Sequence, residues 1–274
     1  MKEYKVDGHV SSFLPEDKEW KLVWNDEFDG NELDKTKWDF RLHMMGKRHR
    51  TWVADEGVEL DGNSNLIFKC IEKDGEICSC QLQTGYNYMD APHKDDGDCW
   101  GGGLVWPIGK FKKHKFVHGH GYYECRCKLQ KKEGWWSAFW IQSPTIGCCD
   151  DTEIAGVEID IMESFKPGNI VKHNVIYNGY GEDYKEVRVG GGDLDVEQWH
   201  TFGLLWDENG YTFYMDGKED GHSDGPMTHR EEFIIISTEV NGYRSKDRCA
   251  SEQAKLAVGD EFIVDYVRVF DIIK

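Results

Sequence analysis

Residues His200–Gly217, HTFGLLWDENGYTFYMDG, are the stretch of sequence that indicates the fold most directly. Two runs of alternating apolar and polar residues flank Asp207–Gly210. Within that connection, the Asn209-Gly210 pair is typical of a tight turn between antiparallel strands. The segment therefore predicts a β-hairpin.

Runs of the same kind recur along the whole chain. They are short, rich in β-branched or aromatic residues, and bounded by turn residues, as is typical of strands. Outside the hairpin, the predicted strands are Lys21–Trp24, Leu66–Ile71, Ile77–Gln83, Tyr122–Leu129, Ser137–Gln142, Val157–Met162, Asn174–Tyr177, Phe233–Val240 and Phe262–Phe270. Because no long stretch has a helical period, we expect an all-β protein built from two packed sheets. Residues 1–18 are interpreted as a polar lead-in, and residues 19–274 as a single domain.

Composition excludes two classes of partner. The chain has 33 Lys and Arg against 51 Asp and Glu, so its formal charge is −18, which repels nucleic-acid phosphates. Its longest apolar run, Trp135–Ile141, is far shorter than the roughly 20 residues of a membrane-spanning helix. We therefore expect neither nucleic acid nor membrane as a partner.

The nine cysteines bear on compartment and on metal binding. An odd number, together with an N-terminus that lacks the apolar core of a secretory signal, favours reduced thiols in a cytoplasmic protein. A secreted chain whose signal has been removed is the alternative. No pair has the spacing of a zinc knuckle, so no metal site is predicted. On strands, the pairs Cys78/Cys80 and Cys125/Cys127 would each lie on one face as small buried residues.

Two glycine clusters, Gly101–Gly103 and Gly190–Gly192, raise the question of a phosphate-binding loop. Neither cluster is followed by Gly-Lys-Ser/Thr or opens a helix, so we interpret both as ordinary loops between strands.

A second informative stretch is Gly156–Ser164, GVEIDIMES. Glu158 and Asp160 lie two residues apart and project from the same face of a strand. On a regular strand Glu163 would point the other way, but one extra residue, a β-bulge among Ile161–Met162, would return it to that face. A solvated acidic edge is the alternative. The apolar residues between the acids favour a central strand instead.

Aromatic residues precede the acids in Lys132–Gln142, KEGWWSAFWIQ. Trp136, Ala138 and Trp140 share one strand face, whereas Trp135 lies on the opposite face and is expected in the core. Exposed indole rings beside clustered carboxylates would suit a sugar ring, which stacks its apolar face on an aromatic side chain.

These residues together carry a family resemblance. The motif Glu-Ile-Asp-Ile-Met-Glu resembles the active-site signature of glycoside hydrolase family 16, in its laminarinase-like, bulged Glu-x-Asp-x-x-Glu form. Other segments resemble the family in the same order over residues 21–271: Leu22–Gly30, Gly121–Leu129, Gly134–Ile141, Trp199–Gly217 and Val264–Phe270. The resemblance implies a β-jelly-roll sandwich of two antiparallel sheets, concanavalin A-like, with an open cleft on the concave sheet and residues 19–274 as the catalytic domain.

The resemblance also implies roles. Glu158 would be the nucleophile, Glu163 the general acid/base, and Asp160 the residue that modulates Glu158 from between them. Trp136 and Trp140 match sugar-stacking positions of the cleft. The chemistry requires no cofactor. A structural calcium on the convex side, near Asp265 and Ser64, is compatible with the resemblance but is not predicted.

The implied function is a monomeric retaining endo-hydrolase of β-linked polysaccharide or oligosaccharide, with β-1,3- or mixed β-1,3/1,4-glucan as the leading substrate. A β-galactan of the agar or carrageenan type is one alternative, and a non-catalytic carbohydrate-binding sandwich is another. Three departures from the family pattern concern the cleft. Glu153 replaces a frequent tryptophan, Tyr177-Asn178-Gly179 replaces a histidine pattern, and no counterpart of a cleft arginine is found around Gly101–Trp106.

Overall fold

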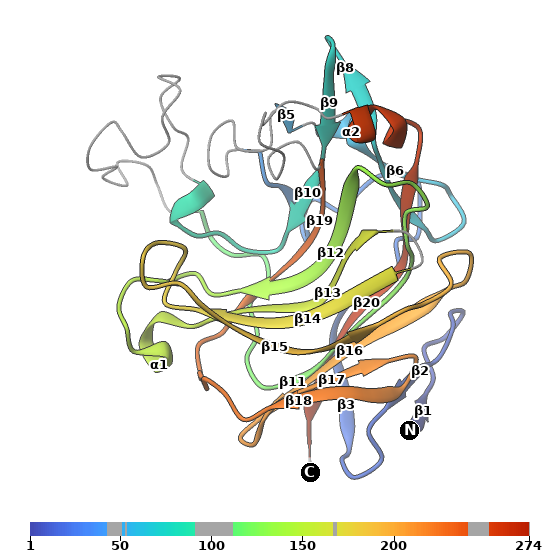
Figure 1. Ribbon diagram of the computed structural model, residues 1–274. Coiled ribbons are helices and arrows are strands. Elements are labelled where there is room, and N and C mark those ends of the chain that lie inside the picture. The colour runs from blue at the N-terminus through green and yellow to red at the C-terminus, as the bar shows by residue number, and fades with distance from the viewer. Residues whose placement is uncertain (43–50, 53, 91–111, 167–168, 241–251, 274) are drawn as a thin grey trace.

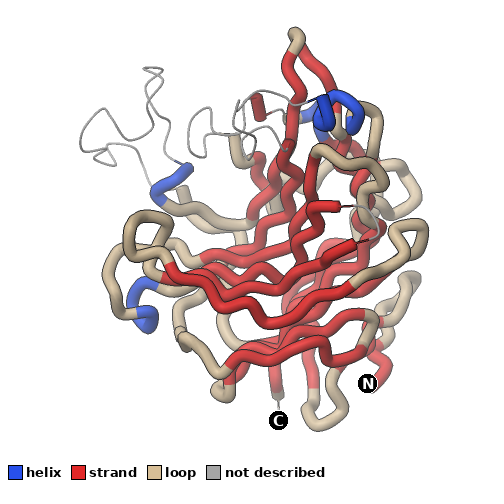
Figure 2. The backbone as a smooth tube through the Cα atoms, viewed as in Figure 1, coloured by secondary structure: helices blue, strands red, loops and turns tan. Residues whose placement is uncertain are grey.

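The computed structural model describes residues 1–42, 51–52, 54–90, 112–166, 169–240 and 252–273. Figure 1 shows two large β-sheets packed face to face, and Figure 2 shows how little of the described chain is helical. The described helices are α1 Thr152–Ala155, α2 Glu252–Ala257 and two 3-10 turns, Asp55–Gly57 and Tyr88–Asp90. Neither α-helix has the length and hydropathy that crossing a membrane requires.

The first large sheet has seven strands in the order β15-β14-β13-β12-β19-β10-β4, all paired antiparallel. Their bounds are β4 Asp39–Phe40, β10 Gln81–Gln83, β12 Trp135–Gln142, β13 Glu158–Lys166, β14 Asn169–Tyr177, β15 Lys185–Gly192 and β19 Phe233–Val240. The strand that carries the three acids, β13, lies inside this sheet between β12 and β14. A central strand, and not an acidic edge, is therefore confirmed.

The second large sheet is ordered β18-β17-β16-β11-β20-β7-β6, with β3 pairing beside β20. Its strands are β3 Trp20–Asp26, β6 Val58–Leu60, β7 Leu66–Lys69, β11 Gly121–Lys128, β16 His200–Asp207, β17 Gly210–Met215, β18 Lys218–Ser223 and β20 Glu261–Ile272. The predicted hairpin is β16–β17, with Asp207 opposite Gly210 at its turn. The all-β sandwich of antiparallel sheets is thus confirmed.

Smaller sheets complete the fold. β5 Thr51–Trp52, β8 Ile71–Lys73 and β9 Glu76–Ser79 form a three-stranded sheet, in which β5 pairs parallel to β9. The run predicted as one strand, Ile77–Gln83, is therefore divided at Cys80 between this sheet and the seven-stranded sheet. Cys78, Cys80, Cys125 and Cys127 are all fully buried, as expected, and the described cysteines are free thiols. Cys99 and Cys249 lie outside the described residues.

The core fills the space between the two large sheets. Trp135, Phe139, Ile159 and Ile161 of the first sheet pack with side chains such as Phe202 of the second, and all are fully buried or nearly so. Trp135 thus lies in the core, as the strand alternation predicts.

The interpretation of Gly190–Gly192 as a loop is wrong, because these glycines end the edge strand β15. A Cβ on Gly190 would lie 2.8 Å from the backbone oxygen of Asp220 on β18, the edge strand of the other sheet. The Gly191 amide also donates to the Asp220 carboxylate at 2.6 Å. Glycine is therefore needed where the edges of the two sheets approach each other. Gly101–Gly103 lie outside the described residues.

The segment expected as a polar lead-in contains two paired strands, β1 Lys2–Tyr4 and β2 Ser12–Leu14. Leu14 is 1% exposed, and the Tyr4 ring packs edge-on against Phe270 of β20, with 5.0 Å between ring centroids. A domain boundary at residue 19 stays a prediction, but residues 1–18 pack on the eight-stranded sheet.

Candidate active site

The three predicted acids, Glu158, Asp160 and Glu163, line one pocket on the outer face of the seven-stranded sheet. The pairing register explains why they meet. Phe139 of β12 faces Met162, but the next residue, Trp140, faces Asp160, so Ile161 has no partner on β12. This is the bulge that the sequence predicts.

The bulge places two consecutive residues, Ile161 and Met162, in the core, where both are fully buried. Its local disruption of the ladder is compensated by His173 of β14, whose Nδ1 lies 2.6 Å from the carbonyl oxygen of Ile161. With two successive side chains turned inward, Glu163 returns to the outer face beside Asp160 and Glu158.

Neighbouring strands complete a grid of polar side chains on this face. On β12, Gln142 lies directly opposite Glu158, and Ala138 lies opposite Glu163. On β14, Asn174 lies opposite Asp160. The amide nitrogen of Asn174 donates to Glu163 Oε2 at 2.7 Å and, at 3.3 Å, to Asp160 Oδ2. One amide thus connects the proposed acid/base to the middle acid.

Asp160 has the most perturbed protonation of the three. It is 4% exposed, and burial together with the negative charges of Glu163 and Glu158 raises its pKa well above the ordinary aspartate value. A raised pKa keeps a proton on Asp160 at pH values where an ordinary aspartate is ionised. In that state Asp160 can donate a hydrogen bond to a neighbouring carboxylate.

Trp136 and Trp140 also line the pocket, although they are more buried than the exposed rings that we expected, at 4% and 7%. The Trp136 ring lies 5.3 Å from the Phe165 ring between centroids. The Trp140 indole is fixed from behind, because its Nε1 donates to Ser237 Oγ at 3.0 Å. The pocket wall therefore offers aromatic surface beside the acids, whereas a role in sugar stacking stays a prediction.

Sequence reasoning missed several polar residues that contact Glu158. Gln142 continues the alternation of Trp136, Ala138 and Trp140, so its position on this face could have been found. The sequence gives no signal for the other two residues. Tyr180 donates a hydrogen bond to Glu158, and the buried Arg41 contacts Gln142. Arg41 follows β4 at the far end of the sheet order, and only the folded chain brings it under the pocket.

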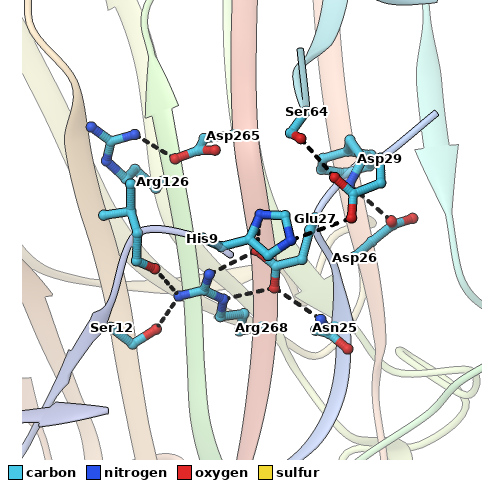
Figure 3. A network of polar contacts seen from close by, with 12 residues as sticks. His9, Ser12, Asn25, Asp26, Glu27, Asp29, Ser64, Arg126, Asp265 and Arg268 are labelled. Carbon is cyan, nitrogen blue, oxygen red and sulfur yellow. Dashed lines mark hydrogen bonds and ion pairs between the residues drawn. The ribbon is translucent and has the colours of Figure 1, made fainter. Parts of the chain in front are cut away.

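The residues considered for calcium already have protein partners (Figure 3). Asp265 pairs with the guanidinium of Arg126, and the Ser64 hydroxyl donates to Asp29 Oδ1 at 2.6 Å. The Arg126 guanidinium on Oδ2 of Asp265 would compete with a metal cation at that oxygen. Among the described residues, no group of three or more His, Cys, Asp or Glu side chains converges on a metal position.

Comparison with known proteins shows a family resemblance in the same part of the chain. The family model described as "Glycosyl hydrolases family 16" matches residues 107–230, a range that includes the three acids and both tryptophans. Over this range the chain is similar to that family of glycoside hydrolases.

Curated relatives include the "Glucan endo-1,3-beta-glucosidase A1" of Niallia circulans, 25% identical over 210 residues, which cover 72% of this chain and 28% of the relative. The "Glucan endo-1,3-beta-glucosidase" of Cryptopygus antarcticus is 26% identical over 250 residues, which cover 81% of each protein. The chain thus spans less than a third of the length of the Niallia protein, but most of the Cryptopygus one.

Solved structures share the fold. The laminarinase from Rhodothermus marinus superposes with a TM-score of 0.69 at 20% identity, covering 94% of this chain and 99% of that one. The catalytic domain of the laminarinase from Thermotoga petrophila gives a TM-score of 0.65 at 21% identity, covering 94% and 100%. At this level of identity the likeness establishes the jelly-roll fold.

Proposed function

We propose that this chain is a retaining, endo-acting hydrolase of β-linked polysaccharide, with β-1,3- or mixed β-1,3/1,4-glucan as its substrate. The observation that carries the proposal is the bulged strand β13, which presents Glu158, Asp160 and Glu163 together in an aromatic-lined pocket. A non-catalytic sugar-binding sandwich would have no need of two glutamates beside a protonatable aspartate. The names of the relatives support a glucan as the substrate.

The reaction follows from the placement of the two glutamates. A carboxylate oxygen of Glu158 attacks the anomeric carbon, the glycosidic C–O bond breaks, and Glu163 gives its proton to the leaving oxygen. Water then attacks the same carbon, Glu163 takes the proton of that water, and the bond to Glu158 breaks to regenerate its carboxylate. Two displacements at one carbon retain its configuration.

Asp160 acts on Glu158 and not on the sugar in this scheme. It lies between the two glutamates on the same strand face, and its raised pKa keeps it protonated. A protonated Asp160 stabilises the Glu158 carboxylate when that charge returns in the second displacement.

Two basic side chains in the pocket favour a second candidate substrate. Lys172 and Arg188 line the wall beside the acids, although the chain as a whole carries a charge of −18. Two cations in the pocket of an acidic protein suit an anionic polymer such as a sulfated β-galactan. Arg188 is paired with Glu186, which reduces the positive charge available and leaves neutral glucan as the first choice.

The test is the release of reducing ends from laminarin, barley β-glucan, agarose and carrageenan by the native chain, with Glu158→Gln as the blank. We expect hydrolysis of laminarin or barley glucan, and product NMR at early times showing the β-anomer first. Release from agarose or carrageenan alone would transfer the proposal to the β-galactan alternative. If the folded protein released no reducing ends from any polymer but still bound one of them, a non-catalytic binding module would be favoured.

A further inference from the structure

A buried polar chain leads from the interior of the sandwich to one oxygen of Glu158. The amide nitrogen of Gln142 donates to Glu158 Oε2 at 2.8 Å, and the Tyr180 hydroxyl donates to the same oxygen. Gln142 is the direct cross-strand neighbour of Glu158 and is 1% exposed. Two donors from different parts of the chain thus converge on one carboxylate oxygen.

Tyr180 reaches the site because of the turn that follows β14. Asn178 and Gly179 both have positive φ, at 62° and 72°, which reverses the chain and directs Tyr180 toward β13. The turn also packs closely on the loop after β12, since a Cβ on Gly147 would lie 2.8 Å from the Gly179 Cα.

The orientation of the Gln142 amide is fixed by its second set of partners. Its oxygen accepts from Arg41 Nη2 at 3.1 Å and from Asn87 Nδ2 at 2.6 Å. A guanidinium has no acceptor, so the amide must turn its oxygen toward Arg41 and its NH₂ group toward Glu158. Gln142 is therefore a donor to Glu158 in every protonation state of the pocket.

Arg41 is itself fixed in place. It is 1% exposed, and its Nε donates to Asp90 Oδ1 at 2.9 Å, while Asn87 Oδ1 accepts from its Nη2 at 3.1 Å. The guanidinium also lies 5.8 Å from the centre of the Trp140 ring. A buried ion pair thus supports the amide that contacts Glu158.

The Tyr180 hydroxyl keeps its proton. Burial and the adjacent Glu158 charge raise the pKa of Tyr180 well above the ordinary tyrosine value, so it remains a donor across the working range.

We infer that Tyr180 and Gln142 are positioning residues for the second displacement, in which Glu158 must leave the anomeric carbon as a carboxylate. Hydrogen bonds to an ionised acceptor are stronger than those to a neutral one. The two donors therefore stabilise the carboxylate more than the glycosyl ester, and they assist the step in which the C–O bond to Glu158 breaks. This inference rests on the proposed function, and it predicts which half-reaction suffers when a donor is removed.

The first experiment compares Tyr180→Phe with Tyr211→Phe. Tyr211 is a fully buried tyrosine of β17 in the other sheet, and its hydroxyl donates to Pro226 O at 3.0 Å, so it matches the substitution away from the site. With a 2,4-dinitrophenyl β-glycoside of a glucan disaccharide, we expect a burst of dinitrophenolate from Tyr180→Phe. Its kcat should fall about 10- to 100-fold with a parallel fall in KM, so that kcat/KM changes little.

A parallel fall of kcat and kcat/KM without a burst, or behaviour equal to that of Tyr211→Phe, would overturn the inference. A second readout does not need turnover: ¹³C NMR of the Glu158 carboxyl. We expect its titration to move to higher pH in Tyr180→Phe and to stay in place in Tyr211→Phe. Failure of the native chain on every glycan refutes the proposed function, whereas an unmoved titration refutes the role of Tyr180.

Gln142→Glu tests the second donor without leaving Arg41 unpaired, because the introduced carboxyl still offers an oxygen to the guanidinium. When that carboxyl is ionised it cannot donate to Glu158 and repels it. We expect activity to be lost at high pH and regained at lower pH, where the introduced group carries a proton. A pH profile identical to that of the native chain would exclude Gln142 as a donor that matters.

Discussion

Two clusters of ionisable side chains in this molecule are stabilised in different ways. The cleft acids (Glu158, Asp160 and Glu163) stand together on one strand and are held by neutral donors, namely Asn174, Gln142 and Tyr180. The Arg268 network (His9, Ser12, Glu27 and Arg268), on the eight-stranded sheet, pairs its one carboxylate, Glu27, with the Arg268 guanidinium (Figure 3).

The Arg268 network shows how a structural charge is buried. The Arg268 guanidinium forms two parallel hydrogen bonds to Glu27, at 2.8 and 2.7 Å. Its remaining Nη1 donates to Val10 O and to Ser12 Oγ, both at 2.8 Å, which attaches the N-terminal strand pair to the sheet. Three acids on one strand face repel one another and, together with burial, raise the pKa of Asp160. Ionisable groups perturbed in this way cluster at functional sites, which supports the proposed active site.

The largest expected effect comes from removing a cleft acid. Glu158→Ala should lower kcat by about 10⁴-fold or more while leaving the melting temperature near that of the native chain, because the acid contributes chemistry and not cohesion. Added azide or formate should restore part of the turnover and give product of inverted configuration. If azide or formate instead rescued Glu163→Ala with inverted product and did not rescue Glu158→Ala, the roles of the two glutamates would be exchanged.

The next largest effect should come from the Arg268 network, and on stability instead of turnover. Arg268→Leu leaves Glu27 buried without its partner, which should cost about 3–5 kcal/mol in urea unfolding. Arg126→Leu, which breaks the partly exposed pair with Asp265, should cost only about 1 kcal/mol. Arg268→Leu should also speed proteolysis within residues 1–18. Equal losses for the two variants would remove the distinction between the clusters.

A smaller effect concerns how stability depends on pH beside the Arg268 network. Burial raises the pKa of Glu124, on β11 beside Arg268, to about 7 from 4.5, although its hydrogen bonds to Tyr266 and Ser12 oppose the shift. The folded chain therefore holds a proton between about pH 4.5 and 7 that the unfolded chain has released. This residue's contribution to stability is fully present below about pH 4.5 and is lost as the pH rises to 7.

Glu124→Gln keeps an acceptor for the Tyr266 hydroxyl but cannot ionise. We expect the variant to match the native chain at pH 4 and to exceed its free energy of unfolding at pH 8, on the order of 1–3 kcal/mol. Urea unfolding at the two pH values checks this. If the variant and the native chain differed in free energy of unfolding by the same amount at pH 4 and at pH 8, the raised pKa of Glu124 would be contradicted.

The smallest expected effect concerns the aromatic wall of the cleft. Trp136→Ala should raise KM for laminarin about 10-fold with little change in kcat, because stacking on the sugar is lost in ground state and transition state alike. The matched control is Trp135→Ala, one residue away on the core face, which should cost about 3–5 kcal/mol of stability. A larger loss of stability for Trp136→Ala than for Trp135→Ala would assign Trp136 to the core.

Several features of the fold and site could be predicted because they depend on local alternation. The strands, the β16–β17 hairpin and the opposite faces of Trp135 and Trp136 all follow from the two-residue period of a strand. The bulge at Ile161 could be predicted as well, since no regular strand places Glu163 beside Asp160. Among the missed strands were the polar or glycine-rich edges β15 and β18, which lack the apolar alternation of the predicted strands.

By itself, then, the sequence determined that the chain is an all-β sandwich and which acids share a face, because neighbours along a strand fix both. Only the tertiary structure decided what surrounds those acids. Arg41, Gln142 and Tyr180 come from separate segments. The contacts of Gln142 and Tyr180 with Glu158, and of Arg41 with Gln142, depend on strand order, register and a turn with positive φ. The same holds for Arg268, whose partners Glu27 and Ser12 lie more than 200 positions away and meet it only after the sheets have packed. Local periodicity encodes which way a side chain points, whereas the partner that it meets there is set by contacts between segments distant in the chain.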